Sequence, residues 1–143
     1  MSSNVRKITS VLGFDFGKKR IGIATGQTIT QSATPLKTIN QVHGNPDWSA
    51  IASEIEEYRP QALIVGMPYH DDGSENEMTA AVDQFCYELE KRFSLPVEKV
   101  NEAFSSQQAE ERLRSGVKIN QHNKHEIDRM AAAIIVQRWL DSR

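Results

Sequence analysis

The chain of 143 residues has a single cysteine, Cys86, so it cannot form an intrachain disulfide. This is typical of a reducing compartment and predicts a cytoplasmic location. A long apolar run is also absent, because the longest, Met130–Val136, is much shorter than the ~20 residues that a helix needs to cross a bilayer. Gly13 and Asp15 interrupt the apolar segment that follows the basic N-terminus, which argues against a signal peptide. We therefore expect neither secretion nor a membrane partner.

Positive charge is not in excess either. The 17 lysines and arginines are outnumbered by 19 aspartates and glutamates, which gives a formal net charge of −2. This excludes a globally basic nucleic-acid-binding protein, so any nucleic-acid site must be a local patch. The 38% share of hydrophobic residues and the 25% share of charged residues are typical of a globular chain. At this length we expect one domain over residues 1–143.

An acid within an apolar segment is the first candidate site residue. The segment Val11–Ala24 has two short apolar strands joined by a basic turn, and Asp15 lies in the first strand between Gly13 and Gly17. A carboxylate buried without a partner is destabilising, so Asp15 needs a cation, a metal ion or hydrogen-bond donors. The alternative is that Asp15 only begins a turn before Gly17.

The remaining segments predict an α/β order. A third strand, Ala33–Ile39, contains Pro35, which lacks an N–H and therefore favours the edge of a sheet. Three strands with short links indicate an antiparallel meander, and the apolar run Ala62–Gly66 indicates a buried parallel strand. The other expected elements are a helix from Pro46 to Tyr58, a helix from Met78 to Phe93, a strand Val97–Glu102, a short helix Gln107–Arg114, a loop Val117–His125 and a last helix Glu126–Leu140.

A second acid lies in the last expected helix. Helical spacing gives one face to Asp128, Ala132, Ile135 and Trp139. The small residues Ala131–Ala133 would let this helix approach a sheet closely and bring Asp128 within metal-bridging distance of Asp15. The alternative is that Asp128 only favours the positive end of the helix dipole.

Short motifs are spread along nearly the whole chain. They are Asp15-Phe16-Gly17 with Lys19-Arg20-Ile21-Gly22, Pro35-Leu36 with Thr38-Ile39, Val65-Gly66-Met67-Pro68 with Asp72-Gly73-Ser74, and Lys124 with Ile127-Asp128 and Ala131-Ala132. With these motifs the sequence resembles the YqgF/RuvX family, and the order of its elements resembles the ribonuclease H-like fold. The resemblance implies a five-stranded mixed sheet flanked by helices, with strands one to three antiparallel and strands one, four and five parallel.

The resemblance also implies an activity. It indicates a cytoplasmic, divalent-metal-dependent endonuclease that processes the 5′ end of pre-16S rRNA in ribosome biogenesis, or a nuclease similar to Holliday-junction resolvases. The family's acids correspond to Asp15, Glu102 and Asp128, as catalytic residues and as ligands of Mg²⁺ or Mn²⁺, which carboxylate oxygens favour. Pre-16S rRNA is the favoured partner and branched DNA the alternative, and we expect a monomer or a weak homodimer.

Two groups compete for the role of the acid between Asp15 and Asp128. Glu102 ends an expected strand, and a rigid element holds a metal ligand more accurately than a loop does. Asp71 and Asp72 lie in a loop, where a turn with Gly73-Ser74 accounts for Asp72 without chemistry. We therefore favour Glu102.

Basic residues near these acids form the expected phosphate-binding patch. They are Lys18, Lys19 and Arg20 in the first turn, with Lys118 and Lys124 in the polar segment before the last helix. The alternative is a solvated basic turn without a ligand.

The chain departs from the family pattern at two places. Asn101-Glu102-Ala103 stands where the family usually has Asp-Glu-Arg, and Thr25-Gly26 stands where Ser-Asp is usual. The first departure is compatible with an RNA-binding ribosome-assembly module of weak activity, which the absence of metal-dependent cleavage would reveal. An actin-like or sugar-kinase ATPase also opens with an acid-glycine strand, but such proteins enclose their nucleotide between two domains.

Overall fold

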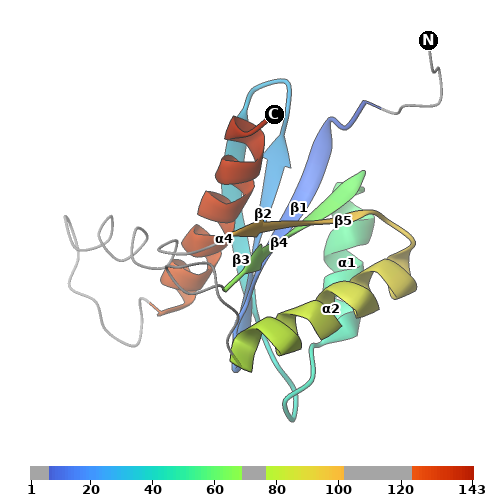
Figure 1. Cartoon of the computed structure of the whole chain (residues 1–143), viewed down its shortest axis with the longest axis vertical. Helices are drawn as coiled ribbons and strands as arrows, with labels where there is room; N and C mark the ends of the chain where they lie inside the picture. Colours follow the sequence, from blue (N-terminus) through green and yellow to red (C-terminus); the bar gives the residue numbers. More distant parts are fainter. Residues whose placement is uncertain (1–6, 69–76, 102–123) are drawn as a thin grey trace.

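The computed structural model describes residues 7–68, 77–101 and 124–143. Its elements in chain order are β1 (Ser10–Phe16), β2 (Arg20–Gln27), β3 (Ser32–Asn40), α1 (Trp48–Tyr58), β4 (Ala62–Met67), α2 (Glu77–Phe93), β5 (Val97–Asn101) and α4 (Lys124–Asp141). The five strands form one sheet in the order β3-β2-β1-β4-β5 (Figure 1). β1, β2 and β3 pair antiparallel, whereas β1, β4 and β5 pair parallel, so the predicted mixed sheet is confirmed. The expected strand Val97–Glu102 ends at Asn101 in the described residues.

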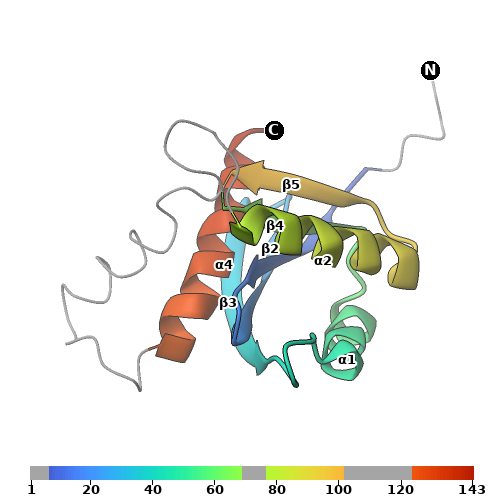
Figure 2. The same cartoon turned by 60° about the horizontal axis from the view of Figure 1, so that its bottom comes forward.

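Helices cover both faces of this sheet (Figure 2). Leu12 and Phe14 of β1 point toward α1 and α2, where they join one cluster of buried side chains. Val11 points toward α4 and packs in a second cluster with residues such as Ala132. Because successive side chains of a strand point to opposite faces, Asp15 shares the α4 face with Val11.

The ends of α1 have local causes. The Asp47 carboxylate accepts a hydrogen bond from the backbone N–H of Ala50 at 3.1 Å, as an N-cap residue does. Arg59 ends the helix in the left-handed conformation (φ 44°), and Pro60 follows it. The expected helix from Pro46 therefore begins at Trp48. Among the helices of the described residues, none has the length and apolarity to span a membrane.

β3 is an edge strand of the described sheet, as Pro35 predicted. The pairing of β3 with β2 shifts register at this point, because Ile23 pairs with Lys37 whereas Ala24 pairs with Pro35. Leu36 is thus the extra residue of a bulge. A residue without an N–H and a bulge are both tolerated where a strand has one neighbour.

Cys86 is a buried free thiol of α2. Burial raises the pKa of this thiol to about 11, so it stays protonated at neutral pH. A protonated, buried thiol is a poor nucleophile, so we assign no chemical role to Cys86.

Candidate functional site

Asp15 lies near the carboxyl end of β1, and the carboxyl ends of the parallel strands β1, β4 and β5 lie on the same side of the sheet. It is half-buried, and its partner in the antiparallel register is Gly22 of β2. Side chains at directly opposed positions of an antiparallel pair point to the same face. The carboxylate of Asp15 therefore extends to the side on which a side chain at position 22 would point.

Gly22 lies directly beneath the backbone of α4. A Cβ atom at this position would collide with the backbone carbonyl of Asp128. The absence of a side chain thus lets the helix approach β2 at the level of Asp15. Asp15 and Asp128, which are far apart in the sequence, are brought to the same face of the sheet at the same height. This juxtaposition is the one expected from the sequence, in which only Ala131–Ala133 indicate a close approach.

Other glycines of the strands also permit the close approach of the helix. A Cβ at Gly13 or at Gly26 would overlap the side chain of Val136. Ala131 and Ala132 of α4 are fully buried. Small residues on both surfaces therefore let α4 pack closely on β1 and β2.

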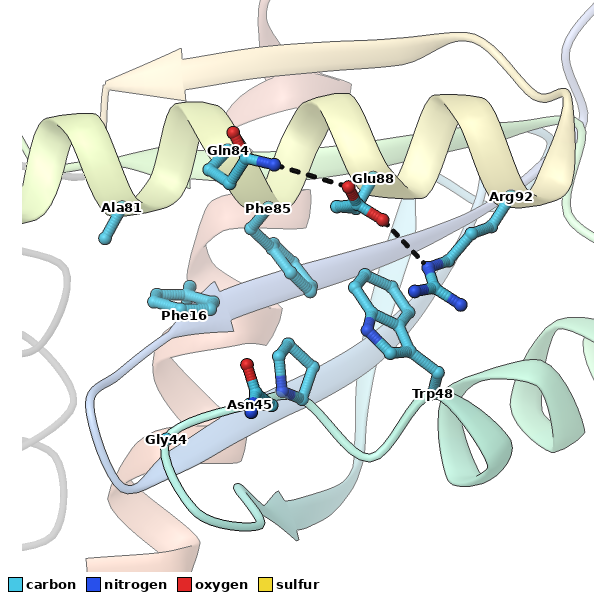
Figure 3. A pocket seen from close by; sticks show the side chains of 10 residues that line it. Phe16, Gly44, Asn45, Trp48, Ala81, Gln84, Phe85, Glu88 and Arg92 are labelled. Carbon is cyan, nitrogen blue, oxygen red and sulfur yellow. Dashed lines mark hydrogen bonds and ion pairs between the residues drawn. The ribbon is translucent and has the colours of Figure 1, made fainter.

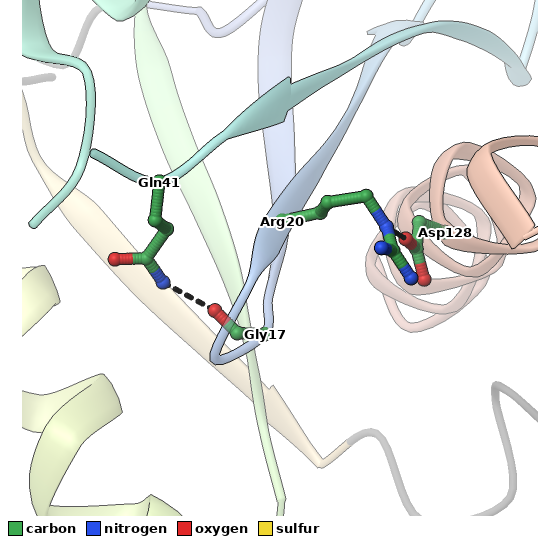
Figure 4. Close-up of polar contacts among 4 residues, drawn as sticks. All are labelled: Gly17, Arg20, Gln41 and Asp128. Atoms are coloured by element: carbon green, nitrogen blue, oxygen red, sulfur yellow. Dashed lines mark hydrogen bonds and ion pairs between the residues drawn. The ribbon is translucent and has the colours of Figure 1, made fainter. Parts of the chain in front are cut away.

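Asp128 has a charged partner that the sequence did not reveal. The Nε–H of Arg20 donates a hydrogen bond to Oδ2 of Asp128 at 2.7 Å, and both side chains are about one-quarter exposed, at 23% and 26% (Figure 4). Asp128 is the fifth residue of α4, and the favourable field of a helix terminus falls off within the first turn. The ion pair with Arg20 is thus a better account of this carboxylate than the helix dipole.

The basic turn between β1 and β2 is fixed by hydrogen bonds of its backbone. The N–H of Gly17 donates to the carbonyl of Arg20 at 2.9 Å, and a Cβ on Gly17 would lie 2.7 Å from that oxygen. Lys18 and Lys19, between these two residues, are exposed. The turn therefore directs two ammonium groups to solvent next to the strand end that carries Asp15.

Gln41, the residue after β3, holds this turn in place. Its backbone N–H donates to the carbonyl of Lys19 at 2.8 Å, and its side-chain Nε2 donates to the carbonyl of Gly17 (Figure 4). Its Oε1 is buried and has no hydrogen-bond partner among the described residues. The role of Gln41 could not be predicted, because nothing in its sequence context distinguishes it from any polar residue that follows a strand.

Several predicted residues lie outside the described part of the chain. They are Glu102, Asp71, Asp72 and Lys118, together with the expected helix Gln107–Arg114 and most of the loop Val117–His125. Lys124 is the first residue of α4. Within residues 7–68, 77–101 and 124–143, no group of three His, Cys, Asp or Glu side chains is placed to hold a metal ion. The predicted acidic triad thus has two described members, Asp15 and Asp128.

Residues that depart from the family pattern make contacts that the structure describes. Gly26 stands where an acid is usual, and Val136 of α4 occupies the space that a side chain there would need. Thr25 donates its hydroxyl hydrogen to the carbonyl of Val11 at 3.2 Å. The carbonyl of Asn101 accepts a hydrogen bond from Nη1 of Arg138 at 2.8 Å, which ties the end of β5 to α4.

The mixed sheet, the helix order and the acid at the end of β1 define a protein of the ribonuclease H-like class. The family model for RuvX, described as Holliday junction resolvase, matches residues 9–142. The chain therefore belongs to the RuvX family.

Relatives with similar sequences span nearly the same length. A protein of Legionella pneumophila, named "Putative pre-16S rRNA nuclease", is 47% identical over 129 residues, which are 90% of this chain and 93% of the relative. Proteins of the same name from Nitrosococcus oceani and Pseudomonas putida are 45% and 38% identical. Their alignments cover 91% and 92% of this chain, and 85% and 94% of the respective relatives.

Solved structures share the fold at low sequence identity. RuvC of T. thermophilus, solved in complex with a Holliday junction substrate, has a TM-score of 0.56 and 16% identity, and the match covers 94% of this chain and 95% of RuvC. The fowlpox virus resolvase in complex with Holliday junction DNA has a TM-score of 0.58 and 13% identity, with 94% and 98% covered. At these identities the likeness is one of fold, and it confirms the predicted ribonuclease H-like architecture.

Proposed function

We propose that this protein is a divalent-metal-dependent endonuclease of the cytoplasm that processes the 5′ end of pre-16S rRNA. The observation that carries the proposal is the common face of Asp15 and Asp128, which the close contact of Gly22 with α4 permits. Two carboxylates held on rigid elements at one end of a sheet are suited to bind metal ions for phosphodiester hydrolysis.

The donor set fits a hard divalent cation. Asp15 and Asp128 offer carboxylate oxygens, which are the ligands that Mg²⁺ and Mn²⁺ prefer, and Glu102 is the proposed third ligand. When bound, such ions lower the pKa of a water nucleophile and stabilise the leaving oxygen. Arg20 orients Asp128 through the ion pair, and a guanidinium has further N–H groups with which to bind a phosphate oxygen.

RNA is the favoured substrate for a specific reason. The relatives named as pre-16S rRNA nucleases are 38–47% identical and match nearly the whole chain. The resolvases in complex with junctions are 13–16% identical, a level at which only the fold is shared. Cleavage of branched DNA is thus the second candidate function, supported by the description of the family.

A direct assay separates these candidates. The purified protein is incubated with a pre-16S rRNA 5′ fragment and with a four-way DNA junction, each with Mg²⁺, Mn²⁺ or EDTA. We expect cleavage of the RNA with either ion, none in EDTA, and slower or no cleavage of the junction. Preferred cleavage of the junction would reassign the substrate, and binding of the RNA without metal-dependent cleavage would indicate an assembly module instead.

The exposed lysines of the first turn are expected to bind phosphate without reading bases. Replacing Lys18 and Lys19 with alanine should weaken RNA binding equally for different sequences and reduce the slope of log K against log salt by about one for each lysine. The matched control is Lys91→Ala, which removes an exposed lysine from the last turn of α2. If the double replacement left the salt slope as unaltered as the Lys91→Ala control does, Lys18 and Lys19 would belong to a solvated turn that binds no phosphate. Lys118 and Lys124 are proposed members of the same patch.

A further inference from the structure

A pocket of about 410 Å³ opens on the sheet face opposite α4, between α2 and the segment that leads into α1, and it reaches the end of β1 at Phe16 (Figure 3). Phe16 forms part of its wall, and Phe16 directly follows Asp15 in β1. Adjacent residues of a strand point to opposite faces. The same strand end therefore carries the candidate catalytic carboxylate on one face and an aromatic ring of the pocket on the other.

The walls of the pocket are aromatic. The ring centroids of Phe16 and Phe85 are 4.9 Å apart, and Trp48 is stacked on Phe85 at 5.7 Å with an interplanar angle of 23°. A pocket of this volume has room for a planar heterocycle. Aromatic side chains bind nucleobases by stacking, which every base permits. Phe85 is buried, whereas Phe16 and Trp48 are partly exposed, so these two rings are the ones available to a base.

A polar row on α2 lines one side of the same pocket. Glu88 accepts hydrogen bonds from Nε2 of Gln84 at 3.3 Å and from Nε of Arg92 at 3.1 Å, and the guanidinium of Arg92 lies 4.3 Å from the centre of the Trp48 ring (Figure 3). The opposite side carries the amide of Asn45. Aromatic walls with both donors and acceptors at the rim suit a base, which has a flat apolar face and a polar edge.

The wall with Asn45 is a hydrogen-bonded hairpin that is connected to the basic turn. Val42 and Asn45 exchange two backbone hydrogen bonds, of 2.7 and 2.9 Å, around His43 and Gly44. Both central residues have positive φ, 52° and 77°, as a two-residue hairpin of type I′ requires. Gln41, which directly precedes this hairpin, is bonded to the turn that carries Lys18 and Lys19. Hydrogen bonds of Gln41 thus connect the hairpin wall of the pocket to the turn.

The distance between the two sites suits one nucleotide. Lys18 is two residues from Phe16, which is at most about 7 Å along the backbone. A strand whose phosphate lies at the exposed lysines can therefore place its base in the pocket.

We propose that this pocket binds one unpaired base of the substrate RNA strand, next to the site of cleavage. The inference rests on the proposed function, because it uses the same turn to hold the phosphate. An unpaired base at a defined position would select single-stranded or frayed RNA over a closed duplex, whose bases remain stacked.

The test fills the pocket without removing a wall. Ala81 of α2 lines the pocket and is exposed, so Ala81→Leu adds bulk there and keeps a good helix former. The matched control is Ala80→Leu, an exposed neighbour on the same helix that does not line the pocket. Binding of a short fluorescent single-stranded oligoribonucleotide is measured in EDTA, so that cleavage does not interfere, and thermal melting verifies the fold of each variant.

We expect Ala81→Leu to bind the oligonucleotide about tenfold more weakly than both the parent protein and Ala80→Leu, within the range for loss of one stacked base. In a series of oligonucleotides with one abasic residue, the parent should lose affinity at one position, whereas Ala81→Leu should be insensitive there. Equal binding by the two leucine variants would overturn the proposal. If no abasic residue lowered the affinity of the parent protein, the proposal would also be wrong. The pocket would then be a candidate site for a protein side chain instead of a base. If the parent protein bound the oligonucleotide in this way but did not cleave RNA with metal ions, the proposed function would be contradicted, whereas the proposal of a base-binding pocket would stand.

Discussion

Asp15→Asn is expected to lower the rate of metal-dependent RNA cleavage by about 10³-fold, equivalent to about 4 kcal/mol of transition-state stabilisation. An amide keeps the shape of the side chain but lacks the negative charge that binds a divalent cation. Asp15 is half-buried on the α4 face, opposite Gly22, where α4 approaches the sheet. The rate is measured in single-turnover cleavage of the pre-rRNA fragment.

A second readout distinguishes loss of metal from loss of folding. Mn²⁺ should raise the melting temperature of the parent protein, because a ligand that binds only the folded state stabilises it. This shift should shrink in Asp15→Asn, whereas the melting temperature without metal should stay within a few degrees. Asp141→Asn is the matched control, since Asp141 is the last residue of α4 and is exposed. Cleavage at the parent rate by Asp15→Asn would refute the assignment of this acid.

Gly22→Ala is expected to destabilise the protein by about 3 kcal/mol and to abolish most of the cleavage. The added methyl group would meet the backbone carbonyl of Asp128 rather than a flexible side chain, so β2 and α4 must separate by roughly an ångström. A displacement of that size moves Asp128 relative to Asp15 and removes the close packing on which the site depends. Urea unfolding and the cleavage rate measure the two effects.

A neighbouring glycine provides the control. The methyl group of Gly13→Ala would overlap the side chain of Val136, which lies two turns further along α4 from Asp128. Val136→Ala in the same chain makes room for it, so the double variant should be more stable than the sum of the single changes predicts, by about 1–2 kcal/mol. The cleavage rate should change little in this double variant. If Gly22→Ala proved as mild as the double variant, the close approach of α4 would not be a requirement of the site.

The strands and helices of the described residues could be predicted because they depend on local patterns, whereas the pairing of the strands in one mixed sheet was implied by the resemblance to the family. The apolar run Ala62–Gly66 predicted a strand that proved to be covered on both faces. Pro35 predicted an edge from a missing N–H, and the described sheet has β3 at its edge. The resemblance to the RuvX family, carried by motifs along the chain, was confirmed by the family model.

The pairing of particular side chains from distant segments could not be predicted. Arg20 and Asp128 are separated by 108 positions, and no sequence pattern pairs a basic residue of a turn with an acid of the last helix. The hairpin around His43 and Gly44 was missed because the segment before Pro46 has no periodicity. The role of Gly22 as the contact point for α4 also required the structure, since a glycine in a strand is compatible with a bulge, a bend or a close approach.

The irregular edge of β3 limits how copies of this protein can assemble. Strands join edge to edge when each presents an uninterrupted row of N–H and C=O groups. Pro35 removes one donor from this row, and the bulge at Leu36 changes the spacing of its neighbours. Lys37 beside it, half exposed and paired with Glu54, adds a charge to the same edge. A continuous sheet through β3 of two molecules is therefore disfavoured, and a homodimer, where it forms, must use a different surface.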